Sequence, residues 1–252
     1  MAGSRGSVVG GDSPSAAEVV VTTMARQIPD GAVVATGAAS PLAILAIAVA
    51  KATHAPRLTY LACIGAIEPE IKRLHGSSED IAYFEGRCGH FTIPDLFDHA
   101  RRGRIDVMFF GAAEVDGMGS TNLTGTGTLE KPLMKFPGVA GAATLRRWVH
   151  RPVLVVGRQN RRNLVARVQI ASTSDPSRRT PLITDLGVFE LCAGGATLLA
   201  RHGAASVEAI RQKTGFAFEA TRPLPVTAEP SAEHLKAIQS IDPERIRDQL
   251  VG

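Results

Sequence analysis

Two short runs of aliphatic and β-branched residues, 32–36 and 58–63, enclose a third apolar segment, 41–53, and this spacing constrains the fold more than any other feature. Each outer run has the length of a buried strand, and the segment between them has the length of a helix. Gly37 ends the first run, and Pro41 suits the first turn of a helix, where its missing N–H is not needed. A strand, a helix and a strand in this order form a βαβ unit with parallel strands. The sequence therefore predicts an α/β fold with an open, largely parallel sheet flanked by helices.

Similar patterns continue along the chain. We expect helices at 16–28 with Ser15 as the N-cap, at 93–102, at 206–212 and at 231–248, the last broken at Asp242-Pro243. We expect strands at 105–110, 153–156 and 164–170, a polar loop at 172–181, and a hairpin made of 188–191 and 196–200. Because there is no internal repeat or break in composition, residues 15–252 are predicted to form one domain, preceded by a flexible Gly/Ser-rich tail at 1–14.

The cysteine count and the hydropathy pattern exclude several classes of protein. Three cysteines in 252 residues, none at the spacing of a zinc site, indicate a reducing compartment, taken here as the cytoplasm, and predict no metal centre. The most apolar stretch, 41–50, is too short to cross a membrane, and the amino end has no apolar leader, so no secretion is expected. No aromatic stacking motif or nucleic-acid-binding module is recognisable.

The charge distribution permits two interpretations. The net charge is +4, and four arginine pairs lie far apart, at 101–102, 146–147, 161–162 and 178–179. Dispersed pairs are typical of a solvated surface. Alternatively, one or two of them attract an anionic ligand, such as the phosphates of coenzyme A.

A glycine-rich segment follows the predicted strand 105–110. Gly111, Gly117 and Gly119 lack the GxGxxG spacing, and no apolar helix follows them, so a nicotinamide dinucleotide site is disfavoured. A long loop with tight turns explains the glycines equally well. The carboxyl end of such a strand is nevertheless where open α/β sheets bind their ligands.

Three segments, 109–122, 135–143 and 183–191, resemble in order and spacing the family I CoA-transferases, and most closely the β-type subunit of the glutaconate CoA-transferase group. That family has Gly-Ala-x-Gln-Val-Asp and then Gly-Asn-x-Asn after a strand. The matching residues here are Gly111, Ala112, Val115, Asp116, Gly119 and Asn122. Glu114 stands where Gln is usual, and Ser120 replaces the first Asn. The resemblance extends from about Ser15 to Arg247, which is nearly the whole chain.

The resemblance implies a carboxylated acyl-CoA as substrate, with coenzyme A entering as part of that substrate and no tightly bound cofactor. It implies that backbone N–H groups of Ala140 and Gly141, in a turn that matches the family's Gly-x-Gly-Gly-Ala, form an oxyanion hole for the thioester carbonyl. The residues expected around the substrate are Gly111, Glu114, Asp116, Asn122, Gly138 and His90. Within this set, Asn122 is the residue expected to orient substrate. Asp116 is expected to hold its loop through backbone N–H groups, and His90 is expected to be structural or to lie in a loop near the pocket.

The same resemblance identifies a missing carboxylate. In these transferases a Glu at the end of the second strand attacks the thioester, and counting from Ala55-Pro56 places Cys63 at that position. Coenzyme A attached to a thiol is a disulfide and not an acyl donor, so Cys63 does not replace the Glu chemically. Cys63 is then either a small buried apolar residue or a thiolate or ligand contact. Glu68 or Glu70 remains as an alternative source of the carboxylate.

These features lead to a functional prediction. The chain is expected to be the β-type subunit of a heteromer with an α-type chain, assembled as α2β2. The loss of the Glu favours hydrolysis or ring opening of an acyl-CoA, because some relatives in steroid-ring degradation also lack it. Two alternatives stay open: a true CoA-transferase whose carboxylate comes from elsewhere, and a catalytically silent structural subunit.

Overall fold

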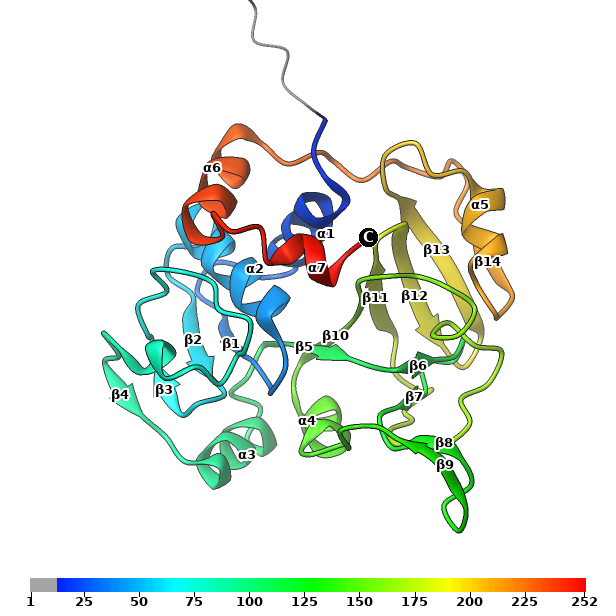
Figure 1. Cartoon of the computed structure of the whole chain (residues 1–252), viewed down its shortest axis with the longest axis horizontal. Helices are drawn as coiled ribbons and strands as arrows, with labels where there is room; N and C mark the ends of the chain where they lie inside the picture. The colour runs from blue at the N-terminus through cyan, green and yellow to red at the C-terminus, as the bar shows by residue number, and fades with distance from the viewer. Residues whose placement is uncertain (1–12) are drawn as a thin grey trace, which may run out of the picture.

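The computed structural model describes residues 13–252, which form one α/β domain around a ten-stranded sheet (Figure 1). The strand order across the sheet is β14-β13-β12-β11-β10-β5-β1-β2-β3-β4. The central strands are parallel and comprise β1 (Val33–Ala35), β2 (Thr59–Ala62), β5 (Val107–Gly111), β10 (Arg151–Val156) and β11 (Thr180–Thr184). On one side, β12 (Gly187–Cys192) is antiparallel to β11 and β13 (Gly195–Arg201) is antiparallel to β12, while β14 (Phe218–Ala220) runs parallel to β13. On the other side, β3 (Ala66–Ile67) is antiparallel to β2 and β4 (Gly89–His90) is antiparallel to β3. The predicted open, largely parallel sheet is confirmed.

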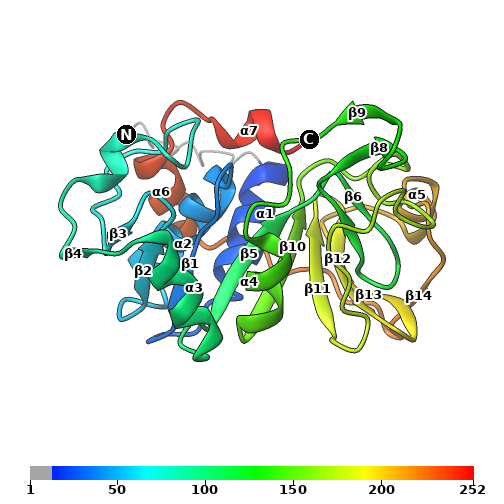
Figure 2. The same ribbon diagram turned by 90° about the horizontal axis from the view of Figure 1, so that it is seen from below.

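Helices cover both faces of the sheet, so the domain has three layers (Figure 2). One face packs against α1 (Ala16–Ala25), α2 (Pro41–Ala52), α6 (Ala232–Ile241) and α7 (Arg247–Leu250), and the other against α3 (Ile93–Arg101), α4 (Ala142–Trp148) and α5 (Val207–Gln212). Strand β5 shows the alternation that serves both layers. Val107 and Phe109 belong to the apolar cluster of α1 and α2, whereas Met108 and Phe110 belong to that of α3 and α4. A continuous apolar run is therefore required at this central strand.

The ends of the predicted helices follow from local capping. Ser15 accepts from the Glu18 N–H, and Glu18 accepts from the Ser15 N–H, so α1 begins with a reciprocal capping box, as its sequence predicts. Helix α2 begins at Pro41, and the break at 242–243 separates α6 from α7. These predicted boundaries are confirmed to within a few residues.

One predicted strand is wrong. Residues 164–170 form an irregular segment with bends, although Leu164 makes a single bridge to Val115. Leu164 is nevertheless part of the apolar cluster beneath α3, α4 and α5, and Val168 is also buried, so the alternation in the sequence reflects burial without a strand. The sheet instead gains β11, part of which was expected to be loop. Pro181 lies near the start of that strand, where a proline is tolerated.

The sheet strands β3, β4 and β14 and the helix α4 were not expected from the sequence. Five further short elements also form outside these expectations. They are the two-stranded pair β6 (Glu114–Val115) and β7 (Thr121–Asn122), the hairpin β8 (Gly125–Gly127) and β9 (Pro132–Lys135), and the 3-10 helix η1 (Ile81–Phe84). Most of the tail predicted at 1–14 lies outside the described residues. No helix within residues 13–252 combines the length and apolarity needed to cross a bilayer.

The path of the chain creates a crevice at the carboxyl edge of the sheet. From β1 the chain passes through α2 to β2 on one side, and it later returns through α3 to β5 on the other side of β1. Because these two connections lead to opposite sides of β1, a gap opens at the carboxyl ends of β1 and β5. Ligands of open α/β sheets bind at this kind of position.

A buried histidine gives the fold a predictable dependence on pH. His202 follows β13, is 6% exposed, and its Nδ1 lies 2.8 Å from the Thr227 hydroxyl. Burial lowers the pKa of His202 to about 4, below the ordinary 6.5. Because the unfolded chain then binds the proton more tightly, the stabilisation is complete above pH 6.5 and is lost as pH falls toward 4. The loss amounts to about 3 kcal/mol over this range.

Urea unfolding of the wild-type chain and of His202→Gln between pH 4.5 and 7.5 tests this expectation. The variant should lose less of its free energy of unfolding than the wild type as the pH falls. Identical slopes would show that His202 is not a source of the pH dependence.

Candidate active site

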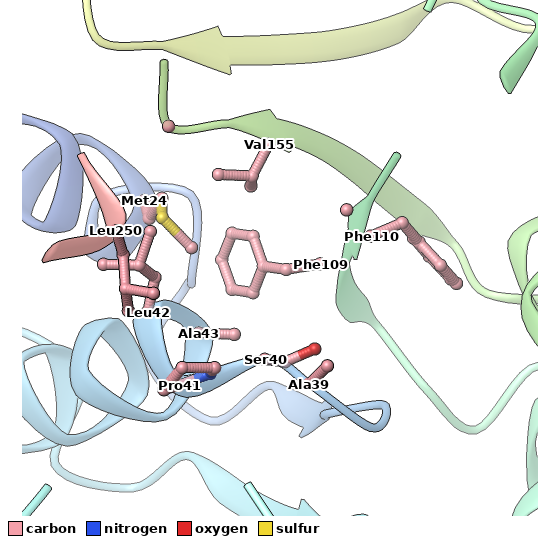
Figure 3. Close-up of a pocket in the computed structure, with 12 residues that line it drawn as sticks. Met24, Ala39, Ser40, Pro41, Leu42, Ala43, Phe109, Phe110, Val155 and Leu250 are labelled. Atoms are coloured by element: carbon pink, nitrogen blue, oxygen red, sulfur yellow. The ribbon is translucent and has the colours of Figure 1, made fainter. Parts of the chain in front are cut away.

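A cavity of about 160 Å³ occupies the crevice between the carboxyl ends of β1, β5 and β10 (Figure 3). Its rim is formed by Ala39, Ser40 and Pro41 at the start of α2, and Gly111 ends β5 at its edge. Figure 3 shows the ring of Phe109 between these groups and the apolar side chains of α1 and α7. The lining is mainly apolar, and the residues are Met24, Ala39, Ser40, Pro41, Leu42, Ala43, Phe109, Phe110, Gly111, Val155, Gly157 and Leu250.

The turn that leads into α2 is conformationally unusual. Ala39 has φ +53°, in the left-handed region that residues other than glycine seldom adopt. Its neighbour Ser40 is the N-cap of α2, and the Ser40 side chain makes no capping hydrogen bond to the helix. Backbone held in this way costs free energy and is concentrated at binding and catalytic sites.

Cys63 follows β2 directly and is held from two sides. Its backbone N–H donates to the Thr36 hydroxyl over 3.3 Å, and its thiol donates to the Ser78 carbonyl over 3.2 Å. The Thr36 hydroxyl also lies 2.9 Å from the buried Tyr60 hydroxyl. The thiol therefore has a defined orientation at the carboxyl end of a central strand.

Ser78 connects this thiol to the cavity. The Ser78 hydroxyl accepts from the Ser40 N–H over 3.1 Å and donates to the Gly37 carbonyl over 3.4 Å. Ser40 lines the cavity, whereas Cys63 is not among the lining residues. The half-buried thiol is thus one hydrogen-bonded residue away from the apolar pocket.

The environment keeps the thiol protonated. Burial raises the pKa of Cys63 above its ordinary value, and the negative charge of Glu79 acts in the same direction. The side chain of Ser78 acts in the opposite direction, and it only partly opposes these effects. A neutral thiol is a weak nucleophile, but it is able to donate a proton. Of the interpretations left open by the sequence, a resident thiolate is disfavoured.

The two carboxylates considered as substitutes for the family's Glu are engaged elsewhere. Glu68 accepts from the Tyr60 N–H and forms an ion pair with Lys51, beside the body of β2 rather than its carboxyl end. Glu70 lies 3.4 Å from Lys72 on the surface. Neither carboxylate is part of the hydrogen-bonded group around Cys63.

Asn122, the residue expected to orient substrate, lies inside its own loop in the chain described here, and that role stays a prediction. It is completely buried, and its amide nitrogen donates to Glu114 and to the Gly125 carbonyl, each over 2.8 Å. Its amide oxygen accepts from the N–H groups of Thr124 and Gly125. Both hydrogens and both lone pairs are therefore used within the loop.

Glu114 and Asp116, which were expected near the substrate, are also buried, and their place in substrate binding stays a prediction. Glu114 accepts from Asn122 and from the Gln169 N–H at 3.0 Å. Asp116 accepts from the N–H groups of Met118 and Ser120, which confirms the loop-holding role expected for it. Burial inside a loop that folds back on itself has no signature in the sequence.

The turn expected to form an oxyanion hole lies just before α4. Gly138 has φ +104° and Ala140 has φ +44°, so two residues of this turn are left-handed. The N–H groups of Ala140 and Gly141 donate to no other group in the part of the chain that the structure describes. They remain available to an incoming oxygen, and the oxyanion role stays a prediction.

Gly141 is constrained by packing rather than by its backbone angles. Its φ is −88°, which any residue adopts, but a Cβ at this position would lie 2.4 Å from the ring of Phe97. A larger residue there would displace that ring, so a substitution at Gly141 perturbs the packing of α3 on α4 together with any role of its N–H.

His90 lies in the edge strand β4, paired with Ala66, and not in a loop near the pocket, which was one of its two expected placements. It is exposed and does not line the cavity. Sequence reasoning also missed Thr36 and Ser78, which hold Cys63. Neither belongs to a recognisable motif, and Ser78 reaches Cys63 only through the tertiary structure.

The chain is similar to known proteins over most of its length. The family model described as Coenzyme A transferase matches residues 18–213. The chain is 23% identical over 250 residues to the B-type subunit of glutaconate CoA-transferase from Acidaminococcus fermentans, covering 90% of this chain and 92% of that protein. It is 28% identical over 181 residues to the cholesterol ring-cleaving hydrolase IpdB subunit of Rhodococcus jostii, covering 65% and 70%.

Among solved structures, the chain is similar to one from the decarboxylase AibA/AibB. The identity is 64%, the TM-score is 0.93, and the match covers 94% of this chain and 99% of that one. Four further structures of that decarboxylase are variants in which one cysteine is replaced by valine, asparagine, alanine or serine.

Proposed function

Because this chain belongs to the coenzyme A transferase family, as its sequence segments indicated, we propose that it is the B-type subunit of a two-subunit enzyme that decarboxylates a carboxylated acyl-CoA. The observation that carries the proposal is the neutral Cys63 thiol at the carboxyl end of β2, next to an apolar cavity. The partner is an A-type chain of the same family, in an α2β2 assembly.

A thiol at this position suits decarboxylation better than acyl transfer. A transferase needs a carboxylate that forms an anhydride with the acyl group, and Cys63 does not supply one. A carboxylate here would also repel the carboxylate that a decarboxylase substrate carries. A protonated thiol leaves that substrate group unopposed and holds a proton for the later step.

The reaction balances with this chain's own groups. The bond from carbon to the substrate carboxylate breaks, carbon dioxide leaves, and the electron pair passes into the conjugated thioester as a dienolate. Cys63 transfers its Sγ proton to the carbanionic carbon, and water returns a proton to the resulting thiolate. This requires a carboxylate that is β to the thioester carbonyl or separated from it by one further C=C bond, as in a glutaconyl group.

Two features assist the charged intermediate. The N–H groups of Ala140 and Gly141 would donate to the thioester oxygen, on which negative charge develops. The apolar walls of the cavity favour loss of the charged carboxylate as uncharged carbon dioxide. We place the acyl group in this cavity, with its reacting carbon toward Ser40 and Cys63.

The relatives support this choice. The chain with 64% identity comes from a decarboxylase, and we infer that Cys63 is the counterpart of the cysteine replaced in its four variants. A hydrolytic or ring-opening reaction, the function favoured by the sequence alone, is the second candidate, because the IpdB subunit of a ring-cleaving hydrolase is 28% identical over 181 residues.

The candidates differ in their products. The chain, co-expressed with the A-type chain of the decarboxylase AibA/AibB, should convert glutaconyl-CoA into a four-carbon enoyl-CoA and carbon dioxide in equal amounts. Hydrolysis would instead release free coenzyme A thiol, and transfer would yield acetyl-CoA when acetate is added. If the complex releases carbon dioxide no faster than the reaction without enzyme, from both malonyl-type and glutaconyl-type thioesters, the proposed function is refuted.

A further inference from the structure

A protruding hairpin carries three of the four most exposed large apolar side chains in residues 13–252. Strands β8 and β9 project from the lower edge of the domain, away from the central sheet (Figure 1). Leu129, Leu133 and Met134 in this hairpin are 72%, 81% and 60% exposed. All four residues of β9 are exposed, so neither of its faces is covered within residues 13–252. Exposed apolar groups concentrated at one place mark a protein interface.

The backbone at the base of the hairpin is nevertheless held by close contacts and hydrogen bonds. A Cβ on Gly125 would lie 2.3 Å from the Met134 carbonyl, and one on Gly127 would lie 2.7 Å from the Lys131 carbonyl. At these two positions the backbones approach so closely that only glycine fits. The Gly127 N–H donates to the Gln169 side chain over 3.1 Å. The buried amide of Asn122 donates to the Gly125 carbonyl and accepts from the backbone N–H groups of Thr124 and Gly125.

A two-stranded hairpin without a covered face is only marginally stable alone in water. In this hairpin, buried polar bonds and two obligatory glycines fix the geometry, while the apolar side chains point into solvent. The structure therefore holds those side chains in place without burying them.

The hairpin also continues into the turn before α4. The Phe136 N–H donates to the Thr124 carbonyl over 3.0 Å, and the Gly138 N–H donates to the Leu123 carbonyl over 3.0 Å. The N–H groups of Ala140 and Gly141 follow directly. A partner that holds the hairpin therefore also holds the turn that carries those donors.

We propose that the tip of this hairpin, residues 128–135, is the surface on which the A-type subunit docks. The inference rests on the two-subunit assembly of the proposed function, but not on its chemistry. The exposed lysines Lys131 and Lys135 border the apolar side chains, with Glu130 as the only acidic residue of the tip. The complementary surface is thus an apolar groove of the A-type subunit that is edged by carboxylates.

The test uses Leu133→Asp in the full chain, co-expressed with the A-type chain of AibA/AibB. Because Leu133 is 81% exposed, the substitution should leave the thermal melt of the separate chain unchanged. Association, measured by light scattering and by titration of purified chains, should weaken on the order of 30-fold or more, as for a residue central to an interface. Leu133→Ala should weaken it less, in the same direction.

Val226→Asp is the matched control, because Val226 is a 47% exposed apolar residue outside the hairpin. It should associate like the wild type. Equal affinity of Leu133→Asp, or failure of the wild-type chain to associate at all, would overturn the proposal. The proposal would also be overturned if Leu133→Asp lost only its self-association and still formed the mixed complex. The hairpin would then bind a second copy of this chain. An assembled wild-type complex that releases no carbon dioxide would refute the proposed chemistry while leaving the docking surface supported.

Discussion

Replacing Cys63 by alanine is expected to lower carbon dioxide release from glutaconyl-CoA by about 10²–10⁴-fold, because this is the usual contribution of a positioned proton donor. Folding should change little, since the half-buried side chain makes a single hydrogen bond, to the Ser78 carbonyl. Turnover by the assembled complex, compared with the thermal melt of the same complex, measures both quantities. Cys63→Ser should recover little activity, because a hydroxyl is a much weaker acid.

Cys88→Ser is the control for this measurement, because Cys88 is exposed and lies outside the cavity lining. It should have wild-type turnover. Activity of the wild type should also fall at alkaline pH, as the proton leaves the thiol, and only above the ordinary range of a cysteine, because burial raises the pKa of Cys63. Full turnover by Cys63→Ala would show that the residue is structural, and it would favour a catalytically silent role for this chain.

Removing Arg247 is expected to destabilise the fold by about 3–5 kcal/mol, as is typical when a buried ion pair loses one partner. Arg247 is 1% exposed, and its guanidinium lies 3.0 Å from buried Asp242 and 2.9 Å from Glu18. Arg247→Met keeps most of the volume but leaves the Asp242 carboxylate without its cation. Thermal unfolding should shift downward by roughly 10 °C.

Two variants make this expectation specific. Arg245→Ala removes an exposed pair with Asp248 and should cost less than about 1 kcal/mol. Combining Arg247→Met with Asp242→Asn should recover part of the loss, because the buried charge is then absent while the side chain still accepts from the Ile246 N–H. An Arg247→Met chain as stable as the wild type would show that Asp242 is solvated or neutral. The pair matters for the site because α7 carries Leu250, which lines the cavity.

The order of helices and strands in the core could be predicted because each signal is local. The apolar runs of β1, α2 and β2 have lengths and flanking residues that only a βαβ unit satisfies. Ser15 caps α1 through a neighbour three residues away, so the start of that helix is specified within four residues. Counting from Ala55-Pro56, which the family resemblance aligned, then placed Cys63 at the carboxyl end of a central strand, where the structure has it.

The site itself depended on contacts between residues far apart in the chain. Ser78 orients the Cys63 thiol from 15 residues away, and Thr36 holds the Cys63 backbone N–H from 27 residues away, without any motif to mark them. Asn122 has an amide that is able to donate and accept hydrogen bonds, as a substrate-binding residue requires. The fold of its loop, however, uses every hydrogen-bonding position of that amide. The amino-acid sequence alone thus determined which strand ends carry polar groups. Tertiary structure decided which of those groups face the cavity, because burial and the pairing of hydrogen bonds are set by segments that meet only after folding.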